Sequence, residues 1–218
     1  MYIPEHFRVH DHADAIGFMR ANPFAILISS PPASPALASS NSDGLFATHL
    51  PVFVAETPEH LLIRCHVAKA NAHWGYLEQQ PNCLTIFHGP HAYVSASNYT
   101  TRENVPTWNY GAVHVYGTAR TFASPEDLQG VLHQLMGTFE PAYAEQWASL
   151  DENYRQRMLS HIVGIEIAVT KIEAKFKLSQ NRTKVEQTNV IASLATAEDT
   201  SVSGVSRLMR EQGLGEKK

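Results

Sequence analysis

The sequence predicts a mainly β protein with flanking helices, an α+β fold in which helices pack outside an antiparallel barrel. Short apolar runs of strand-forming residues, separated by turn-forming residues, follow one another through the first half of the chain. Helical patterns come next, and a single late strand returns after them. With 218 residues, of which 44% are hydrophobic, the chain is long enough to bury a sizeable core.

The first half of the chain carries most of the predicted strands. After a short helix that begins near Asp11, strands are expected over 24–28, 45–54, 61–67, 83–88, 92–97 and 107–122, with a helix over 71–79. The segment 29–43 is rich in Ser and Pro and predicts a loop, and His88-Gly-Pro-His91 predicts a turn. In the longest run, aliphatic residues alternate with aromatic and polar ones, which suits a barrel wall beside a ligand.

The second half of the chain is predicted to be helical around one strand. Ser124, followed by Pro and two acids, begins a helix whose apolar stripe runs to Phe139. Further helices are expected near Pro141 and from Asp151, then a strand over 163–178. Residues 183–213 are amphipathic and helical. We therefore expect a barrel domain over 1–182 and a helical extension over 183–218.

Composition limits the possible classes of protein. The net charge is −4 and the pI about 6.3, so the chain lacks the basic surface of a protein that binds nucleic acid over a whole face. No apolar run approaches the roughly 20 residues that span a bilayer, and no secretory signal is evident, so a cytoplasmic protein without membrane contact is expected. Two cysteines predict free thiols, not a disulfide framework.

Several kinds of catalytic site are not indicated by the sequence. Twelve histidines are present, but His88 and His91 flank Gly-Pro and no carboxylate has matching spacing, so no metal site is expected. The chain has no Gly-x-Ser-x-Gly motif and no Gly-rich phosphate loop after a strand. No catalytic residue is assigned.

A group of polar and aromatic residues lies on the predicted strands and at their ends, and its chemistry fits flavin mononucleotide (FMN). Lys69 and Arg64 are expected to neutralise the FMN phosphate, and Thr48 and Asn71 to add neutral donors. The full group of candidate cofactor-binding residues is Thr48, His49, Arg64, His66, Lys69, Asn71, Trp108, Asn109, Lys177 and Gln180.

The ring of the flavin is flat and amphipathic, which suits the other members of this group. Trp108 or Tyr110 is expected to cover a ring face, and Lys177 or Gln180 to bond the pyrimidine edge. A cation at that edge favours an anionic reduced flavin. The alternative is that each of these residues is a solvated strand end.

At these residues the sequence resembles the PaiB family of FMN-binding negative transcriptional regulators. The resemblance rests on seven segments in register, at residues 1–4, 48–51, 66–71, 86–95, 105–110, 163–167 and 177–181. It implies an antiparallel split β-barrel of the FMN-binding type, distantly similar to pyridoxamine-phosphate oxidase. It also implies a homodimer with two FMN sites at the subunit interface.

The resemblance does not decide the activity, because split barrels serve several functions. A flavin-dependent oxidoreductase or flavin reductase is one alternative. A haem-binding protein is another, with His49, His66 and His114 as the candidate ligands.

We predict weak or undetectable direct DNA binding by the isolated protein. The basic residues are spread along the chain, and residues 183–213 lack a clear helix-turn-helix pattern. A DNA-binding regulator neutralises several phosphates, and log K then falls by roughly 0.9 per contact with log salt. A titration with promoter fragments at two salt concentrations measures this. Sequence-specific binding tighter than micromolar at physiological salt would contradict the prediction.

Overall fold

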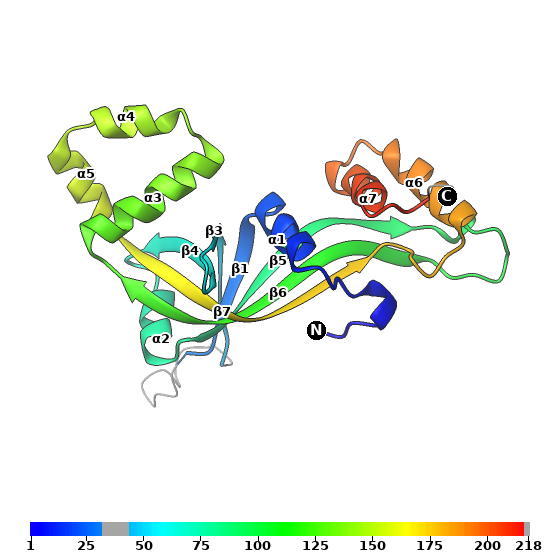
Figure 1. Ribbon diagram of the computed structural model, residues 1–218, viewed down its shortest axis with the longest axis horizontal. Coiled ribbons are helices and arrows are strands. Elements are labelled where there is room, and N and C mark those ends of the chain that lie inside the picture. The colour runs from blue at the N-terminus through cyan, green and yellow to red at the C-terminus, as the bar shows by residue number, and fades with distance from the viewer. Residues whose placement is uncertain (32–43, 216–218) are drawn as a thin grey trace. The chain divides into compact units, whose positions relative to one another are not determined.

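The computed structural model describes residues 1–31 and 44–215 (Figure 1). Its strands are β1 (Phe24–Ser29), β2 (Phe46–Pro51), β3 (Phe53–Glu56), β4 (Leu61–Ala68), β5 (Asn82–Val94), β6 (Thr107–Phe122) and β7 (Ile162–Lys177). The α-helices are α1 (His12–Ala21), α2 (His73–Gln79), α3 (Pro125–Phe139), α4 (Tyr143–Ser149), α5 (Glu152–Leu159), α6 (Lys184–Ala195) and α7 (Thr200–Glu211). Two 3₁₀ turns, η1 (Glu5–Phe7) and η2 (Ala96–Asn98), complete the described elements.

The strands form one sheet in the order β2-β1-β5-β6-β7-β4-β3, so β2 and β3 are its two ends and the hydrogen bonding does not close. The registers of β1 with β2 and β5, and of β4 with β3 and β7, are all antiparallel. The predicted class, mainly β with flanking helices, is confirmed. No helix in the described ranges combines the length and the apolar character needed to cross a membrane.

The chain divides into two compact units. We call the first the terminal unit, which comprises Met1–Phe18, His88–Val113 and Glu173–Lys218. The second, the central unit, comprises Met19–Phe87 and His114–Ile172. The division falls within β5, β6 and β7, so each of these strands contributes residues to both units. The predicted boundary between residues 182 and 183 stays a prediction.

The core of the central unit is built from the inward positions of its strands. Ile63, Cys65 and Ile165 are fully buried, and Cys65 pairs with Ile165 across β4 and β7. Helix α3 covers β3 and β4 with its apolar stripe, of which Leu128, Val131 and Leu135 are buried. The side chain of Ser124 accepts a hydrogen bond from the Asp127 N–H and so caps this helix, as the sequence predicts.

The terminal unit has its own core beneath α6 and α7. The rings of Phe18 and Phe176 pack 5.0 Å apart, and Val190, Val205 and Met209 of the two helices are fully buried. Thr183 and Glu186 form a reciprocal capping box that begins α6. The predicted helical segment 183–213 is therefore two packed helices, and Asp199 caps the second.

The turn predicted at His88-Gly-Pro-His91 is wrong. Strand β5 runs through it without interruption. The register of β1 with β5 covers only Cys83–Ile86, so Pro90 lies beyond this ladder and its missing N–H costs no hydrogen bond to β1. One predicted strand, 45–54, is divided at Val52 into β2 and β3. Most of the predicted loop at 29–43 lies outside the described residues.

Two glycine substitutions in the central unit are expected to change stability in opposite directions. A Cβ at Gly117 meets the Ala168 carbonyl oxygen at 2.6 Å, so Gly117→Ala should lower the free energy of unfolding by about 1–3 kcal/mol. Gly130 lies in α3 with no neighbour within 4 Å of an added Cβ, so Gly130→Ala should raise it by about 0.5–1 kcal/mol. Urea unfolding of both variants measures the difference, and equal effects would contradict the packing described.

Candidate functional site

In the central unit, Thr48 and Asn71 meet at a buried histidine that the sequence analysis does not single out. The side-chain amide of Asn71 donates to Thr48 Oγ1 at 3.3 Å, and Asn71 Oδ1 accepts from the His73 N–H at 3.0 Å. His73 Nδ1 lies 2.8 Å from Thr48 Oγ1, and its Nε2 lies 2.9 Å from Ser29 Oγ. The predicted donors Thr48 and Asn71 are thus held in one network.

The His73 ring is fully buried between two hydroxyl groups. Burial lowers the pKa of His73 to about 4, so the ring is neutral near pH 7. In that state one ring nitrogen donates and the other accepts. His73 therefore fixes the hydroxyl of Thr48 and contributes no charge.

The two cations that are predicted to bind the FMN phosphate differ in their surroundings. Arg64 Nε donates to Glu166 at 2.6 Å, and Arg120 Nε donates to the other carboxylate oxygen at 2.7 Å. Burial raises the pKa of Glu166, but the hydrogen bonds and charges of the two arginines outweigh it and hold this pKa below its usual value. Lys69 is exposed, and no described residue forms an ion pair with it.

The backbone holds Lys69 in the turn that also contains Asn71. The Lys69 N–H donates to the His161 carbonyl at 2.7 Å, and the Lys69 carbonyl accepts from the Trp74 indole at 2.9 Å. The Asn71 N–H closes the turn onto Ala68 at 2.8 Å. The backbone that carries the exposed Lys69 side chain is therefore fixed in the same turn as Asn71.

The two predicted histidines in the central unit lie in different environments. His66 Nδ1 is buried without a partner in the described chain, and burial lowers the pKa of His66. His49 is exposed on β2, its ring centroid 6.2 Å from that of Phe24.

In the terminal unit, Trp108 and Asn109 project from opposite faces of β6. Trp108 is 52% exposed and lies 5.7 Å from the His91 ring and 6.2 Å from the Tyr93 ring. Asn109 is fully buried, and its amide donates to Ser179 Oγ at 2.9 Å. Adjacent strand positions alternate in this way, so the two predicted residues cannot serve the same face.

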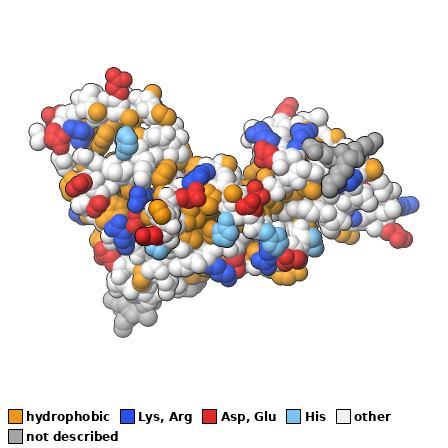
Figure 2. Space-filling model, in the orientation of Figure 1, with side chains coloured by type: hydrophobic (Ala, Val, Ile, Leu, Met, Phe, Trp, Pro, Cys, Tyr) orange, Lys and Arg blue, Asp and Glu red, His pale blue; other side chains and the backbone are white. Residues whose placement is uncertain are grey.

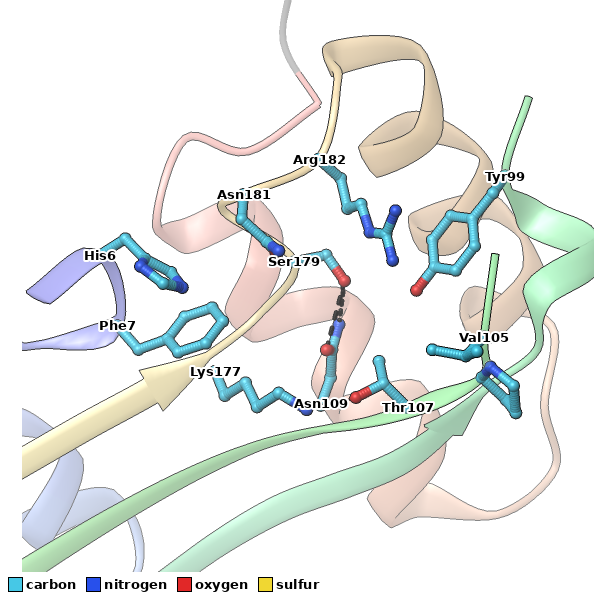
Figure 3. Close-up of a pocket in the computed structure, with 11 residues that line it drawn as sticks. His6, Phe7, Tyr99, Val105, Thr107, Asn109, Lys177, Ser179, Asn181 and Arg182 are labelled. Carbon is cyan, nitrogen blue, oxygen red and sulfur yellow. Dashed lines mark hydrogen bonds between the residues drawn. The ribbon is translucent and has the colours of Figure 1, made fainter. Parts of the chain in front are cut away.

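Asn109 and Lys177 line a cavity of about 190 Å³, which we call the Tyr99 cavity (Figure 3). Lys177 Nζ donates to Thr107 Oγ1 and, at 2.8 Å, to the Trp108 carbonyl. Burial, and then the positive charge of Lys175, lowers the pKa of Lys177. The lining residues are His6, Phe7, Tyr99, Val105, Pro106, Thr107, Asn109, Lys177, Ser179, Asn181 and Arg182.

Gln180 has a local structural role. Its amide nitrogen donates to the Phe176 carbonyl at 2.6 Å, and its oxygen accepts from the Leu178 N–H at 2.7 Å. Between them, Ser179 has a φ of 66°. Gln180 thus stabilises the turn that ends β7 and positions the residues after Lys177.

Sequence reasoning missed His73, Tyr99 and Arg182 as residues of these sites. His73 stands two residues after the 66–71 segment, and Tyr99 lies between the 86–95 and 105–110 segments, so closeness to those segments was the available signal. Arg182 directly follows the 177–181 segment, and in the structure its guanidinium lies 3.9 Å from the Tyr99 ring centroid.

The residues of the central unit fit the phosphate end of FMN. They supply an exposed cation and the second N–H of the Asn71 amide, and the Thr48 hydroxyl is a third donor in the tautomer in which His73 Nδ1 carries the proton. The orphaned Nδ1 of His66 is a further polar atom in this unit without a protein partner in the described ranges. Among the described residues, no three His, Cys, Asp or Glu side chains are grouped to hold a metal ion. Cys65 and Cys83 are free, and burial raises the pKa of both thiols.

Comparison with known proteins shows the family of the chain. The model of a family described as "Putative FMN-binding domain" matches residues 1–171. The Protease synthase and sporulation protein PAI 2 of Bacillus subtilis (strain 168) is 34% identical over 214 residues, which cover 97% of this chain and 98% of the relative.

Solved structures show the same fold at low sequence identity. The flavocytochrome Anf3 from Azotobacter vinelandii superposes with a TM-score of 0.59 and 14% identity, covering 80% of this chain and 72% of that one. The FAD and haem binding protein from Mycobacterium smegmatis gives a TM-score of 0.56 and 11% identity, with coverages of 78% and 73%.

The fold and the family match define a flavin-binding split-barrel protein, and its cofactor is FMN. The chain belongs to the FMN-binding domain family, and its likeness to PAI 2 extends over nearly its whole length. The predicted split barrel and the predicted cofactor are both confirmed.

Acid should destabilise the protein through His73. The pKa of this ring is about 4 in the folded protein and about 6.5 in an unfolded chain, so below pH 6.5 the unfolded state binds the extra proton. The resulting loss grows as pH falls from 6.5 to 4 and reaches about 3 kcal/mol. Urea unfolding at pH 7 and pH 5 should therefore show a smaller difference for His73→Gln than for the native chain. Equal pH dependence in the two proteins would contradict the neutral buried ring.

Proposed function

We propose that this protein is an FMN-binding regulator of the PaiB type, in which Lys69 neutralises the FMN phosphate. The observation that carries the proposal is that Lys69 is exposed, in an ion pair with no described residue, and lies in the turn whose Asn71 amide donates to the Thr48 hydroxyl. A phosphate dianion is the kind of partner that such a cation and such donors stabilise.

Lys69 is a better candidate for this role than Arg64. Arg64 Nε donates to Glu166 and Nη1 donates to Gln134 at 3.5 Å, so the charge of Arg64 is already paired, and moving the guanidinium onto a phosphate would break an ion pair that is mostly buried. Leaving Glu166 with only Arg120 costs free energy that an exposed lysine does not have to offset. The contacts of Trp108, Asn109, Lys177 and Gln180 with the flavin ring stay predictions.

The proposed regulatory role draws on the name of one relative. The Bacillus subtilis relative is named for protease synthase and sporulation. On the face shown in Figure 2, Lys and Arg side chains lie among Asp and Glu side chains, without one broad basic patch. We propose that regulation proceeds through the flavin or a partner protein, with weak or no direct contact to DNA.

We further propose a homodimer. Trp108 and Tyr93 are about half exposed on neighbouring strands β5 and β6, and such an aromatic pair is typical of surfaces that a partner covers. In the apolar stripe of α3, Leu128, Val131 and Leu135 are buried within the chain and not available for this purpose, whereas Phe139 at its end is half exposed. Light scattering at micromolar concentration is expected to give twice the chain mass of 24.2 kDa. A mass near one chain would remove the dimer and the shared flavin sites.

Phosphate recognition by Lys69 predicts a specific pattern of flavin affinities. FMN at 100 times its dissociation constant should raise the free energy of unfolding by about 2.7 kcal/mol. Riboflavin, which lacks the phosphate, should raise it far less at the same concentration. Lys69→Met should weaken FMN binding by about 10–100-fold and leave riboflavin binding unchanged. Fluorescence titration measures both affinities.

A second lysine of the central unit provides the matched control. Lys171→Met removes a cation that lies 5.2 Å from the Tyr116 ring centroid, and it should leave FMN affinity unchanged. If Lys171→Met and Lys69→Met weakened FMN binding equally, only general charge attraction would be involved.

Arg64→Met should instead lower the melting temperature of the flavin-free protein, because it leaves Glu166 with one partner.

A further inference from the structure

The Tyr99 cavity has features that the proposed phosphate site in the central unit does not use. At about 190 Å³ it is smaller than the roughly 300–1,000 Å³ of pockets that hold drug-sized molecules. It is therefore suited to a ligand smaller than a whole flavin nucleotide. All of its lining residues belong to the terminal unit.

The cavity has a positive lining without a negative counterpart. Lys177 and Arg182 both line it, and no carboxylate is among its described lining residues. Arg182 Nη1 donates to Asn104 Oδ1 at 2.6 Å, and the guanidinium packs on the Tyr99 ring. The ammonium of Lys177 has three donors, of which two bond to Thr107 and Trp108. Each cation thus keeps N–H donors for another acceptor.

The acidic side chain Glu186, at the start of α6, forms no ion pair with either cation. One of its oxygens accepts from the N–H and hydroxyl of Thr100, both at 3.1 Å, and the other accepts from the Thr183 N–H at 3.1 Å. This carboxylate is buried and committed to capping the helix.

An independent sign of a missing ligand is the Tyr99 hydroxyl. Tyr99 is only 8% exposed, and its hydroxyl is buried without a hydrogen-bond partner among the described residues. Figure 3 shows this hydroxyl directed into the cavity, beside the guanidinium of Arg182. Buried hydroxyl groups almost always have a partner, since an unpaired one costs stability.

Apolar side chains also line the cavity, at separate places (Figure 3). Phe7 of η1 contributes an aromatic ring, and Val105 and Pro106 contribute aliphatic groups. Val105 is 71% exposed, so this part of the lining reaches the solvent. A ligand for this cavity therefore needs an anionic end and a compact apolar body.

We propose that the Tyr99 cavity binds a small organic carboxylate, which accepts hydrogen bonds from Lys177, Arg182 and the Tyr99 hydroxyl. Its apolar body packs against Phe7 and Val105. This proposal gives Lys177 a role other than its predicted contact with the flavin ring, and occupancy of the cavity does not require bound flavin. The protein would then respond to a carboxylate metabolite as well as to FMN.

A pair of fluorinated probes tests the charge preference directly. ¹⁹F NMR titration of the full chain, with and without FMN, compares 4-fluorobenzoate with its neutral isostere 4-fluorobenzamide. The carboxylate should bind about tenfold or more tightly than the amide, because charge-assisted hydrogen bonds are stronger than neutral ones. Equal affinities, no saturable binding of either probe, or displacement of 4-fluorobenzoate by one equivalent of FMN would each overturn the proposal.

Tyr99→Phe provides a test in which stability and binding change in opposite directions. Removing an unpaired buried hydroxyl should raise the melting temperature by about 2–4 °C, while the lost donor weakens 4-fluorobenzoate binding by about 3–10-fold. A Tyr99→Phe variant with unchanged affinity would overturn the role of the hydroxyl and the proposed site with it.

Two lysine variants separate the cavity from general charge effects. Lys177→Met should weaken 4-fluorobenzoate binding by about tenfold or more. Lys184→Met removes an exposed cation of α6 that lies outside the cavity lining, so it should leave binding unchanged. Equal losses in the two variants would contradict a localised site. If Lys177→Met fails to fold, the probe pair and Tyr99→Phe still decide the question.

Discussion

Side-chain alternation along the extended strands β6 and β7 is the constraint on which both the cores and the polar sites depend. Successive residues of a strand face opposite sides, so a position on β6 is committed to one face by its neighbours. Asn109 shares its face with the fully buried Val113, whereas Trp108 faces outward. On β7, Lys175 and Lys177 share a face for the same reason, and Phe176 enters the core between them. A shift of one residue would exchange every one of these assignments.

Two buried polar groups in this chain differ in whether they have hydrogen-bond partners. His73 is satisfied at both ring nitrogens and remains neutral, so it stabilises the fold and fixes Thr48. The Tyr99 hydroxyl is buried without a described partner beside two cations. A group of the first kind serves structure, since its hydrogen bonds are complete. A group of the second kind weakens the folded protein, and a ligand that completes the hydrogen bond would offset that cost.

The ion pairs of the central unit explain why residue type alone is a poor guide to ligand contacts. Arg64 lies within β4 and Lys69 directly after it; both are basic and only five residues apart, so the sequence assigns them the same role. The antiparallel register pairs Arg64 with Glu166 on β7, and this pairing uses its guanidinium inside the protein. Lys69 lies past the end of the strand, and its side chain forms no ion pair with a described residue. Strand pairing between distant segments thus gives two residues of similar chemistry different roles.

Much of the architecture follows from local patterns in the sequence. The strands, the helix that begins at Ser124 and the late strand were predictable because alternation, helical periodicity and capping depend on residues close in the chain. The family and FMN were predictable from short segments in register. The turn expected at His88-Gly-Pro-His91 was wrong, since whether proline is tolerated in a strand depends on which neighbour pairs with it.

The sequence by itself determined the fold class, the cofactor and most of the secondary structure. Only the tertiary structure decided which polar side chains are satisfied by partners distant in the chain. His73 meets Ser29 across 44 residues, and Arg64 meets Glu166 across 102. Arg182 meets Tyr99 in the cavity, although neither residue belongs to the segments that identify the family. The physical reason is that desolvation and hydrogen bonding depend on distances in space, which local periodicity does not encode.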